Sequence, residues 1–261
     1  MDRAAVLVTA PPPSGAGGAR IDRTTWIAAT VSEARHETER ARTLRLDVPG
    51  WSGHLPGQHV DVRLTAEDGY TAVRSYSIAS GQGSGVLELT VDRLDDGEVS
   101  PYLVDDVEVG DHLEIRGPAG LWFLWDPDDD GPVQLIGGGS GVVPLMAMVR
   151  THGDQASSAP FRLLYSVRSP ELAIFRDELN DRERTDGALH VGWAYSRITP
   201  PGWPHSPARL DHAAVERAVF PPALRPAVFV CGSTPFVESI ANTLLDLGHD
   251  PADIRTERYG G

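Results

Sequence analysis

Three short segments of the sequence gather residue types that do chemistry. The first, VRSYSIAS at 73–80, carries a cation, a phenol and several hydroxyls near the end of a predicted strand: Arg74, Ser75, Tyr76, Ser77 and Ser80. A strand with one face on a core alternates apolar and polar residues. This segment has more polar groups than that alternation needs, which indicates a binding surface.

The second segment, GGGSGVVP at 137–144, leads from a predicted strand into a predicted helix. Glycines let a backbone approach a phosphate closely, and the start of a helix supplies N–H donors and a positive dipole. The segment is not a GxGxxG motif, because Val142 stands at the last glycine position, and it lacks the lysine of a P-loop. A tight strand–helix turn without a ligand stays open as the alternative.

The third segment, VFVCGSTPFVESI at 228–240, places a thiol, a glycine and hydroxyls where a strand stops. Cys231 is the single cysteine of the chain. A lone cysteine is often only a small buried hydrophobic residue, so a structural role is the alternative here.

The elements that must position these segments fall into two groups. Up to about Asp126 the pattern is β, with short alternating runs at 24–34, 41–48, 58–64, 73–80, 85–93 and 111–117. One helix interrupts them, with Ser100 as its N-cap and Pro101 at its first position. Runs of this kind, separated by Gly, Pro and Asp, predict a small antiparallel barrel.

After Asp126 the pattern changes to alternating strands and helices. Apolar strands are predicted at 132–138, 161–167, 189–196, 226–232 and 253–259, and helices at 140–151, 170–179, 210–218 and 235–247. Such alternation predicts a doubly wound α/β domain with a parallel sheet. We therefore expect a tail at 1–22, a barrel domain at 23–126, a linker at 126–132 and an α/β domain at 133–261.

Composition limits the function further. The 261 residues are 41% hydrophobic and carry a formal net charge of −14, which argues against nucleic-acid binding. One cysteine excludes a Cys-ligated iron–sulfur cluster held by this chain alone. No apolar run is long enough to span a membrane, and no secretory signal is evident, so a cytoplasmic protein is expected.

Metal and hydrolase chemistry lack their motifs. The sequence has no HExxH and no CxxC, and the acidic segment at 126–132 lacks EF-hand spacing. Ser140 lies in a glycine loop without the histidine and aspartate of a hydrolase following in order. We therefore expect no metal site.

Five motifs occur in an order that resembles the ferredoxin–NADP(+) reductase superfamily: RSYS at 74–77, GEVS at 97–100, GGGSGVVP, CGSTPFVE at 231–238 and ERYGG at 257–261. The resemblance covers residues 24–261 and is strongest to bacterial oxygenase reductases without an iron–sulfur domain. It implies a barrel that binds flavin, an FAD-binding domain of the ferredoxin-reductase type, followed by an α/β domain that binds a nicotinamide nucleotide.

The resemblance also assigns the flavin residues. Arg74 would pair with the pyrophosphate, Tyr76 would lie against the isoalloxazine ring, and Ser77 would hydrogen-bond near N5. The other residues implied on the FAD side are Ser75, Val91, Arg93, Gly97, Val99, Ser100 and Tyr259. A pyrophosphate site favours FAD over FMN.

On the nucleotide side, the resemblance places Cys231 beside the nicotinamide C4 and Tyr259 over the flavin. Glu257 and Ser77 would relay the proton that accompanies flavin reduction. The implied NAD(P) residues are Gly138, Gly139, Ser140, Gly141, Pro144, Arg168, Ser196, Arg197, Cys231 and Gly232. Ser233 replaces the usual proline after Cys-Gly, and a frayed solvated tail is the alternative for ERYGG.

The implied activity is an FAD-dependent NAD(P)H oxidoreductase, which takes hydride onto flavin N5 and passes electrons to a separate ferredoxin or oxygenase-type protein. Two alternatives stay open: a stand-alone flavin or quinone reductase or oxidase, and a non-catalytic nucleotide-binding module. Arg168 and Arg197 favour NADPH over NADH as donor, because a 2′-phosphate needs cations. Ordinary surface arginines are the alternative.

Overall fold

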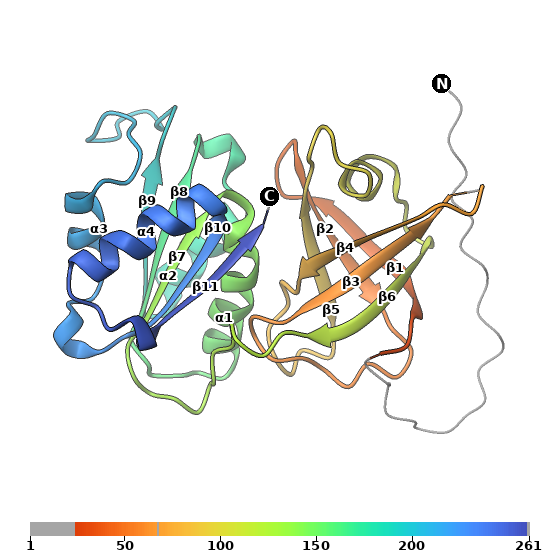
Figure 1. Ribbon diagram of the computed structural model, residues 1–261, viewed down its shortest axis with the longest axis horizontal. Coiled ribbons are helices and arrows are strands. Elements are labelled where there is room, and N and C mark those ends of the chain that lie inside the picture. The colour runs from red at the N-terminus through yellow and green to blue at the C-terminus, as the bar shows by residue number, and fades with distance from the viewer. Residues whose placement is uncertain (1–23, 67, 260–261) are drawn as a thin grey trace.

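The structure is a computed structural model that describes residues 24–66 and 68–259. Two units follow one another along the chain, a β-barrel and an α/β unit, and they pack side by side (Figure 1). The tail expected at 1–22 and the last two glycines lie outside the described residues. Within those residues, no helix has the length and apolar character that a bilayer crossing requires.

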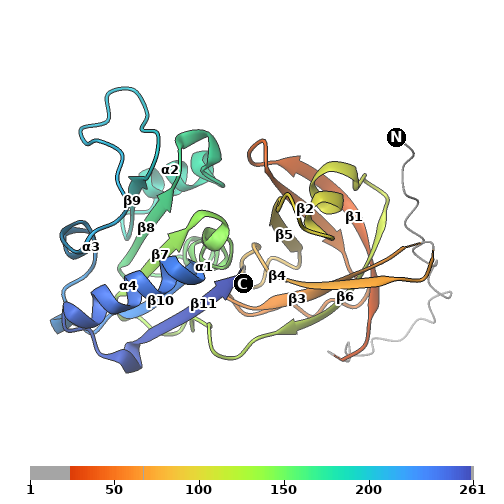
Figure 2. The same ribbon diagram turned by 45° about the horizontal axis from the view of Figure 1, so that its top comes forward.

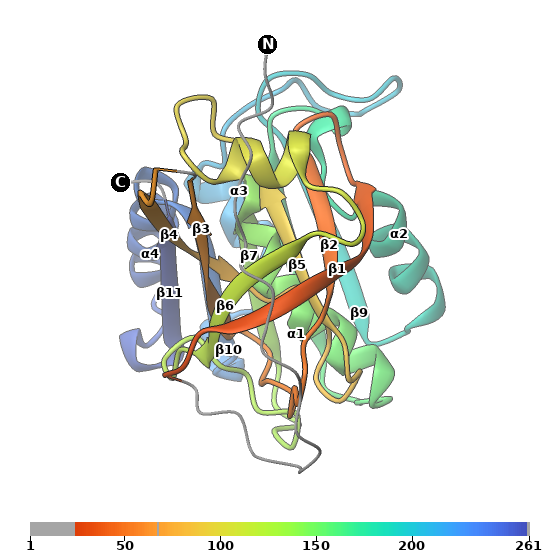
Figure 3. The same cartoon turned by 90° about the vertical axis from the view of Figure 1, so that its right-hand side faces the viewer.

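The barrel contains six strands in the order β4-β3-β6-β1-β2-β5, with every neighbouring pair antiparallel (Figure 3). The strands are β1 (Ile27–His36), β2 (Ala41–Asp47), β3 (His59–Thr65), β4 (Thr71–Ser77), β5 (Leu87–Asp92) and β6 (His112–Ala119). A single antiparallel bridge between Ile78 and Leu89 connects the two outer strands. The predicted β segments are thus all present.

Alternation along the strands builds the barrel core. In β2, Leu44 and Leu46 are buried, whereas Arg45 and Asp47 face outward. The helical segment after β5 closes one end, because Leu103 and Val104 are buried in the same core. Residues Tyr102–Asp106 of that segment have π-helical geometry.

The predicted N-cap at Ser100 is wrong. Ser100 already has helical conformation, and no side chain caps this helix. Its hydroxyl instead accepts a hydrogen bond of 3.0 Å from the Leu94 backbone N–H. Ser100 therefore fixes the loop that precedes the helix.

The second unit contains a five-stranded parallel sheet in the order β11-β10-β7-β8-β9. Its strands are β7 (Val133–Gly138), β8 (Phe161–Val167), β9 (Leu189–Tyr195), β10 (Ala227–Ser233) and β11 (Ile254–Tyr259). Its helices are α1 (Val142–Asp154), α2 (Arg176–Thr185), α3 (His212–Ala218) and α4 (Thr234–Asp246). The predicted fold class, an antiparallel barrel followed by a doubly wound parallel sheet, is confirmed.

Helices cover both faces of the parallel sheet (Figure 2). Successive strand residues point to opposite faces, so Leu135 packs in the cluster with α1 and α2, whereas Ile136 packs in the cluster with α3 and α4. The first cluster also includes Ala41 and Ala79 of the barrel. The α1 face of the sheet is therefore the face that meets the barrel.

The helix predicted at 170–179 begins later than expected. Residues Pro170–Leu172 form one 3₁₀ turn, and α2 begins at Arg176. Between them, Phe175 has a left-handed conformation with φ +59°, which interrupts a continuous helix. The Ile174 N–H next to it donates to the Tyr165 hydroxyl at 3.2 Å.

The order of the parallel strands reverses between β7 and β10. The chain passes from β7 to β8 and β9 on one side, and then returns to β10 on the other side of β7. Open parallel sheets bind ligands at the carboxyl ends of strands beside such a reversal. The two strand ends singled out by the sequence are the two that flank it.

Candidate functional site

The loop after β7 and the end of β10 are in direct contact. Gly137 and Cys231 are neighbours in the sheet. The Gly141 backbone lies so close to β10 that a Cβ there would be 2.2 Å from the Cys231 carbonyl oxygen. Only glycine permits this approach, so the predicted glycine loop is required by packing at this position.

The glycine loop also has an open side. Gly139 has φ +56°, and a Cβ on it would meet nothing within 4 Å. The loop leads into the first turn of α1, where Pro144 is buried and needs no N–H partner. Residues Gly138, Ser140 and Gly141 therefore form a backbone cradle at a helix start, which suits an anion.

Strand β11 adds a carboxyl group to this cradle. Glu257 is the neighbour of Cys231 in the sheet. Its Oε2 atom is buried and has no hydrogen-bond partner among the described residues. Burial raises the pKa of Glu257 to about 7, so this carboxyl exchanges its proton near neutral pH.

Two further groups beside Glu257 are held neutral. Burial raises the pKa of the Cys231 thiol, and the nearby charge of Glu257 raises it further. The Tyr259 hydroxyl donates a 2.6 Å hydrogen bond to the Gly138 carbonyl oxygen, and burial raises the pKa of this phenol also. A neutral thiol is a poor nucleophile, so Cys231 is suited to packing and not to covalent chemistry.

The barrel contributes Asp92, which the sequence analysis missed. It ends β5, and the Ser140 hydroxyl of the glycine loop hydrogen-bonds to its carboxylate. Burial raises the pKa of Asp92, while the positive charges of Arg40 and Arg168 oppose that rise. No motif marks this aspartate, because only the packing of the two domains brings it to the loop.

The RSYS and GEVS segments also meet. Arg74 Nη2 donates to Glu98 Oε2 at 2.6 Å, and both side chains are about half exposed. Tyr76 packs against the barrel core, and burial raises its pKa. Ser77 ends β4 opposite His59. The end of β11 lies between the domains beside β4, so the two halves of the site face one another (Figures 1 and 2).

Four predicted flavin residues have other local roles. Ser75 points to the other side of β4, where its hydroxyl donates to Asp61 Oδ1 at 2.6 Å. Arg93 pairs with Asp105 at 2.7 Å and with Asp95 at 2.5 Å. Val91 and Val99 are buried in the barrel core. The side chain of Ser75 is thus directed away from Arg74, and the valines can offer a ligand only their backbone.

The GEVS segment is also closely packed. A Cβ on Gly97 would be 2.8 Å from Ser100 Oγ, so this loop requires glycine. The Gly97 N–H donates to the Leu94 carbonyl, and the Ser100 hydroxyl accepts from the Leu94 N–H. The loop shape is therefore fixed before any ligand binds.

The predicted 2′-phosphate residues come together at the ends of β8 and β9. The Ser196 N–H donates to the Val167 carbonyl at 2.9 Å, and the Arg197 N–H donates to the Arg168 carbonyl at 3.0 Å. Both arginines are exposed. The remaining predicted residue, Gly232, lies beside Cys231 and touches Phe236, since a Cβ there would be 2.7 Å from that ring.

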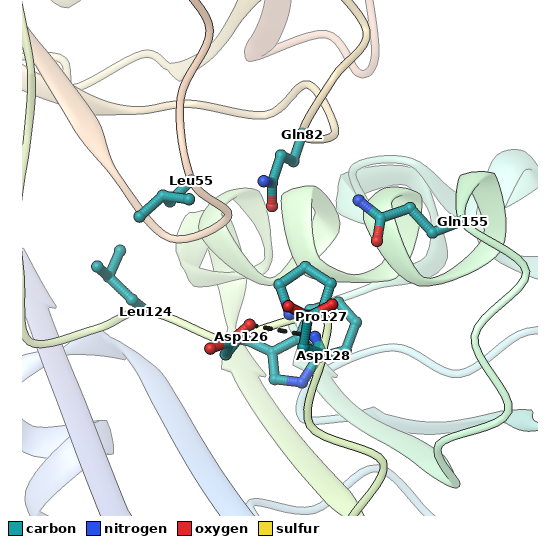
Figure 4. A pocket seen from close by; sticks show the side chains of 8 residues that line it. Leu55, Gln82, Leu124, Asp126, Pro127, Asp128 and Gln155 are labelled. Atoms are coloured by element: carbon teal, nitrogen blue, oxygen red, sulfur yellow. Dashed lines mark hydrogen bonds between the residues drawn. The ribbon is translucent and has the colours of Figure 1, made fainter.

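A cavity also lies away from this site. It measures about 390 Å³ and lies between barrel residues Leu55 and Gln82, the linker at 126–128, and Gln155, which follows α1 (Figure 4). Helix α1 runs back along the sheet from the glycine loop, and Gln155 follows its C-terminal end, so this cavity lies at the other end of α1 from the glycine loop. Across residues 24–66 and 68–259, no cluster of His, Cys, Asp or Glu could hold a metal ion.

Comparisons with known proteins match the two parts of the chain to two domain families. Residues 28–124 match the family of oxidoreductase FAD-binding domains, and residues 135–242 match that of oxidoreductase NAD-binding domains. The glycine betaine monooxygenase reductase subunit of Chromohalobacter salexigens is 32% identical over 208 residues, 78% of this chain and 56% of that protein. The chain thus spans about half the length of this relative.

Two further matches cover more of the chain. The toluate 1,2-dioxygenase electron transfer component of Pseudomonas putida is 26% identical over 243 residues, 88% of this chain and 67% of that protein. The FAD/NAD-binding domain of nitric oxide dioxygenase from Vibrio cholerae has a TM-score of 0.80 at 25% identity, covering 90% of this chain and 99% of that structure. Both domains and their order are therefore shared with flavin- and nucleotide-dependent oxidoreductases.

A Glu257→Gln variant should reveal the raised pKa in its stability. The native carboxyl holds its proton up to about pH 7, whereas an unfolded one releases it near 4.5. Wild type therefore loses stability as pH rises through that window, by at most about 3 kcal/mol, and Gln removes the loss. Urea unfolding at pH 5 and pH 8 should show that the free energy of unfolding of the variant, relative to that of wild type, is higher at pH 8 than at pH 5. The exposed Glu238→Gln is the control, and an equal change there would contradict the assignment.

A Gly141→Ala variant should bind the nicotinamide nucleotide at least about tenfold more weakly while it retains FAD. The added Cβ collides with the Cys231 carbonyl and must displace the loop. Titration of the flavin spectrum with NADP⁺ and NAD⁺ measures this. Gly187→Ala is the matched control, because a Cβ there meets nothing within 4 Å. Unchanged affinity in Gly141→Ala would show that the loop does not contact the nucleotide.

Proposed function

Because the chain belongs to the ferredoxin–NADP reductase superfamily of flavoprotein oxidoreductases, we propose that it oxidises NAD(P)H with a bound FAD and delivers the electrons to a separate redox protein. The observation that supports this most directly is the buried, unpartnered Oε2 of Glu257 beside Cys231 and the glycine loop. When bound, the flavin supplies the hydride-accepting chemistry, and the protein supplies orientation and electrostatics.

The barrel residues would hold the FAD. Arg74 is exposed in the middle of β4 and pairs with Glu98 of the GEVS segment, where its guanidinium suits a pyrophosphate. An incoming phosphate would compete with Glu98 for Arg74, so we expect this ion pair to exchange when FAD binds. Tyr76 offers a partly buried ring, and Ser77 a hydroxyl at the strand end.

The α/β residues would hold the nucleotide. Ser140 and its neighbouring glycines offer backbone N–H groups at the start of α1. Cys231, as a neutral thiol, would lie beside the nicotinamide. The Tyr259 hydroxyl donates a hydrogen bond to the Gly138 carbonyl, worth about 1 kcal/mol, and the residue is 38% exposed, so an incoming ring would displace it at modest cost.

Glu257 would bind and release the proton that accompanies flavin reduction. Its pKa of about 7 means that it both holds and releases a proton under neutral conditions. Ser77, on the barrel side, is the second group that we assign to this relay. No other acid or base is required of the protein for hydride transfer itself.

The acceptor is proposed from two facts. Several relatives are named as reductase or electron transfer components of oxygenases. This chain has one cysteine, so it carries no Cys-ligated iron–sulfur cluster of its own. A reduced flavin on this chain would therefore pass its electrons to a separate acceptor. We propose a redox protein as that acceptor, and faster reduction of oxygen or free flavin would favour a stand-alone reductase instead.

The first test is the visible spectrum of the purified protein before and after anaerobic NADPH, and then NADH. We expect the bands of oxidised flavin to bleach with at least one nucleotide. A flavin-containing protein that bleaches with neither would contradict the oxidoreductase proposal. A protein that cannot be reconstituted with FAD would leave only a binding module.

We propose NADPH as the better donor, with Arg197 as the discriminating residue. Loss of a charge-assisted hydrogen bond to the 2′-phosphate should lower kcat/KM for NADPH about tenfold or more in Arg197→Ala and leave NADH nearly unchanged. Steady-state kinetics with both donors measure this. Arg184→Ala, at another exposed arginine, on α2, is the control. An unchanged NADPH to NADH ratio would refute the role of Arg197.

A further inference from the structure

The two domains touch along a short stretch of α1. The Gln82 N–H of the barrel donates to Thr151 Oγ1 at 2.8 Å. A Cβ on Gly81 would be 3.2 Å from both Arg150 Cβ and the Thr151 nitrogen. The barrel segment after β4 therefore lies directly against the second half of α1.

Arg150 lies at the centre of this contact and bonds to both domains. Its Nη1 atom donates to the Ala79 carbonyl and to Glu88 Oε2, each at 2.9 Å. Its Nε and Nη2 atoms donate to the two oxygens of Glu178 on α2, at 2.9 and 2.6 Å. One guanidinium thus joins a barrel backbone, a barrel strand and a helix of the nucleotide domain.

Burial makes this arrangement rigid. Arg150 is only 7% exposed. Its guanidinium lies over the Phe175 ring, 4.9 Å from its centre, and Phe175 is the left-handed residue before α2. The planar fork of arginine has donors in fixed directions, which lysine cannot reproduce.

The contact is well placed to act on both halves of the site. Ala79 follows Ser77 by two residues, and α1 begins directly after the glycine loop at Val142. From Val142 to Arg150 the helix is a stiff spacer of about 12 Å. A shift at Arg150 would therefore move β4 relative to the glycine loop. The covalent connection between the two domains is the coil at 126–132, so contacts such as that of Arg150 must fix their relative position.

We propose that Arg150 is a positioning residue that sets the distance between the flavin strand β4 and the nucleotide loop, an inference that rests on the proposed function. Hydride transfer needs reacting atoms about 3–3.5 Å apart, and a misplacement of about 1 Å can slow it about a hundredfold. The barrel carboxylate Glu88 shares this role, because it is the side chain that Arg150 bonds across the interface.

Glu88 and Glu178 form a matched pair for the test. Both pair with Arg150, but only Glu88 lies in the other domain. Glu178 forms a bidentate pair with Arg150, whereas Glu88 accepts one hydrogen bond from it. If Arg150 only stabilised the fold, Glu178→Ala would have the larger effect on every measurement. If Arg150 positions the domains, Glu88→Ala should have the larger effect on hydride transfer.

The experiment is anaerobic stopped-flow reduction of the FAD-loaded protein by NADPH, with FAD content and thermal midpoint measured in parallel. We expect Glu88→Ala and Arg150→Lys to lower the limiting reduction rate about tenfold or more, with FAD content and nucleotide Kd retained. The charge-transfer absorbance between nicotinamide and flavin should weaken in the same variants. Glu178→Ala should lower the thermal midpoint and change the rate by less than Glu88→Ala.

The outcomes separate the two proposals. Wild-type flavin that does not bleach would refute the proposed function. If the wild-type flavin bleaches and Glu88→Ala is reduced at the same limiting rate, the positioning role is refuted and the proposed function stands. A larger rate loss in Glu178→Ala than in Glu88→Ala would assign Arg150 to stability alone. If Arg150→Lys fails to fold, the Glu88 and Glu178 pair still decides between these results.

Discussion

The close approach of Gly141 to the Cys231 carbonyl is the constraint on which the rest of the site depends. It holds the end of β7 against the end of β10 where the strand order reverses, and it leaves no room for a side chain. Because β11 pairs with β10, the same constraint brings Glu257 beside Cys231 and Tyr259 within reach of Gly138. A binding loop, a proton-holding group and an aromatic ring thus follow from one contact between two backbones.

The chain is strongly acidic, yet the site is less negative than its composition suggests. Burial raises the pKa of Glu257 to about 7 and also raises the pKa of Asp92, and both shifts favour the neutral form of a carboxyl. A dinucleotide brings its own negative phosphates, which a cluster of ionised carboxylates would repel. Desolvation therefore lowers the repulsion that an anionic ligand would meet beside these two carboxyls.

Local sequence patterns predicted the fold class and the strands, because alternation and glycine placement are local properties. They also identified the two strand ends beside the reversal. Prediction failed where a distant residue decides the outcome. Ser100 is not the N-cap, because its hydroxyl accepts a hydrogen bond from the Leu94 N–H, and a left-handed Phe175 delays the start of α2. Ser75 stays a predicted flavin residue, although its hydroxyl donates to Asp61 of the neighbouring strand. Asp92 was missed because it reaches Ser140 only through domain packing. The order of β10 and β11 in the sheet is likewise a tertiary property.

Strand β4 is joined along its length to β3, and in the described part of the chain its other edge meets β5 only through the bridge after its end. Main-chain groups on such an edge remain available to a ligand, whatever side chains the strand carries. A ligand bound along this edge through main-chain groups would therefore not depend on the side-chain identities of Val73 and Ser75. Such main-chain binding would give this strand a tolerance to sequence change that its polar side chains alone do not suggest.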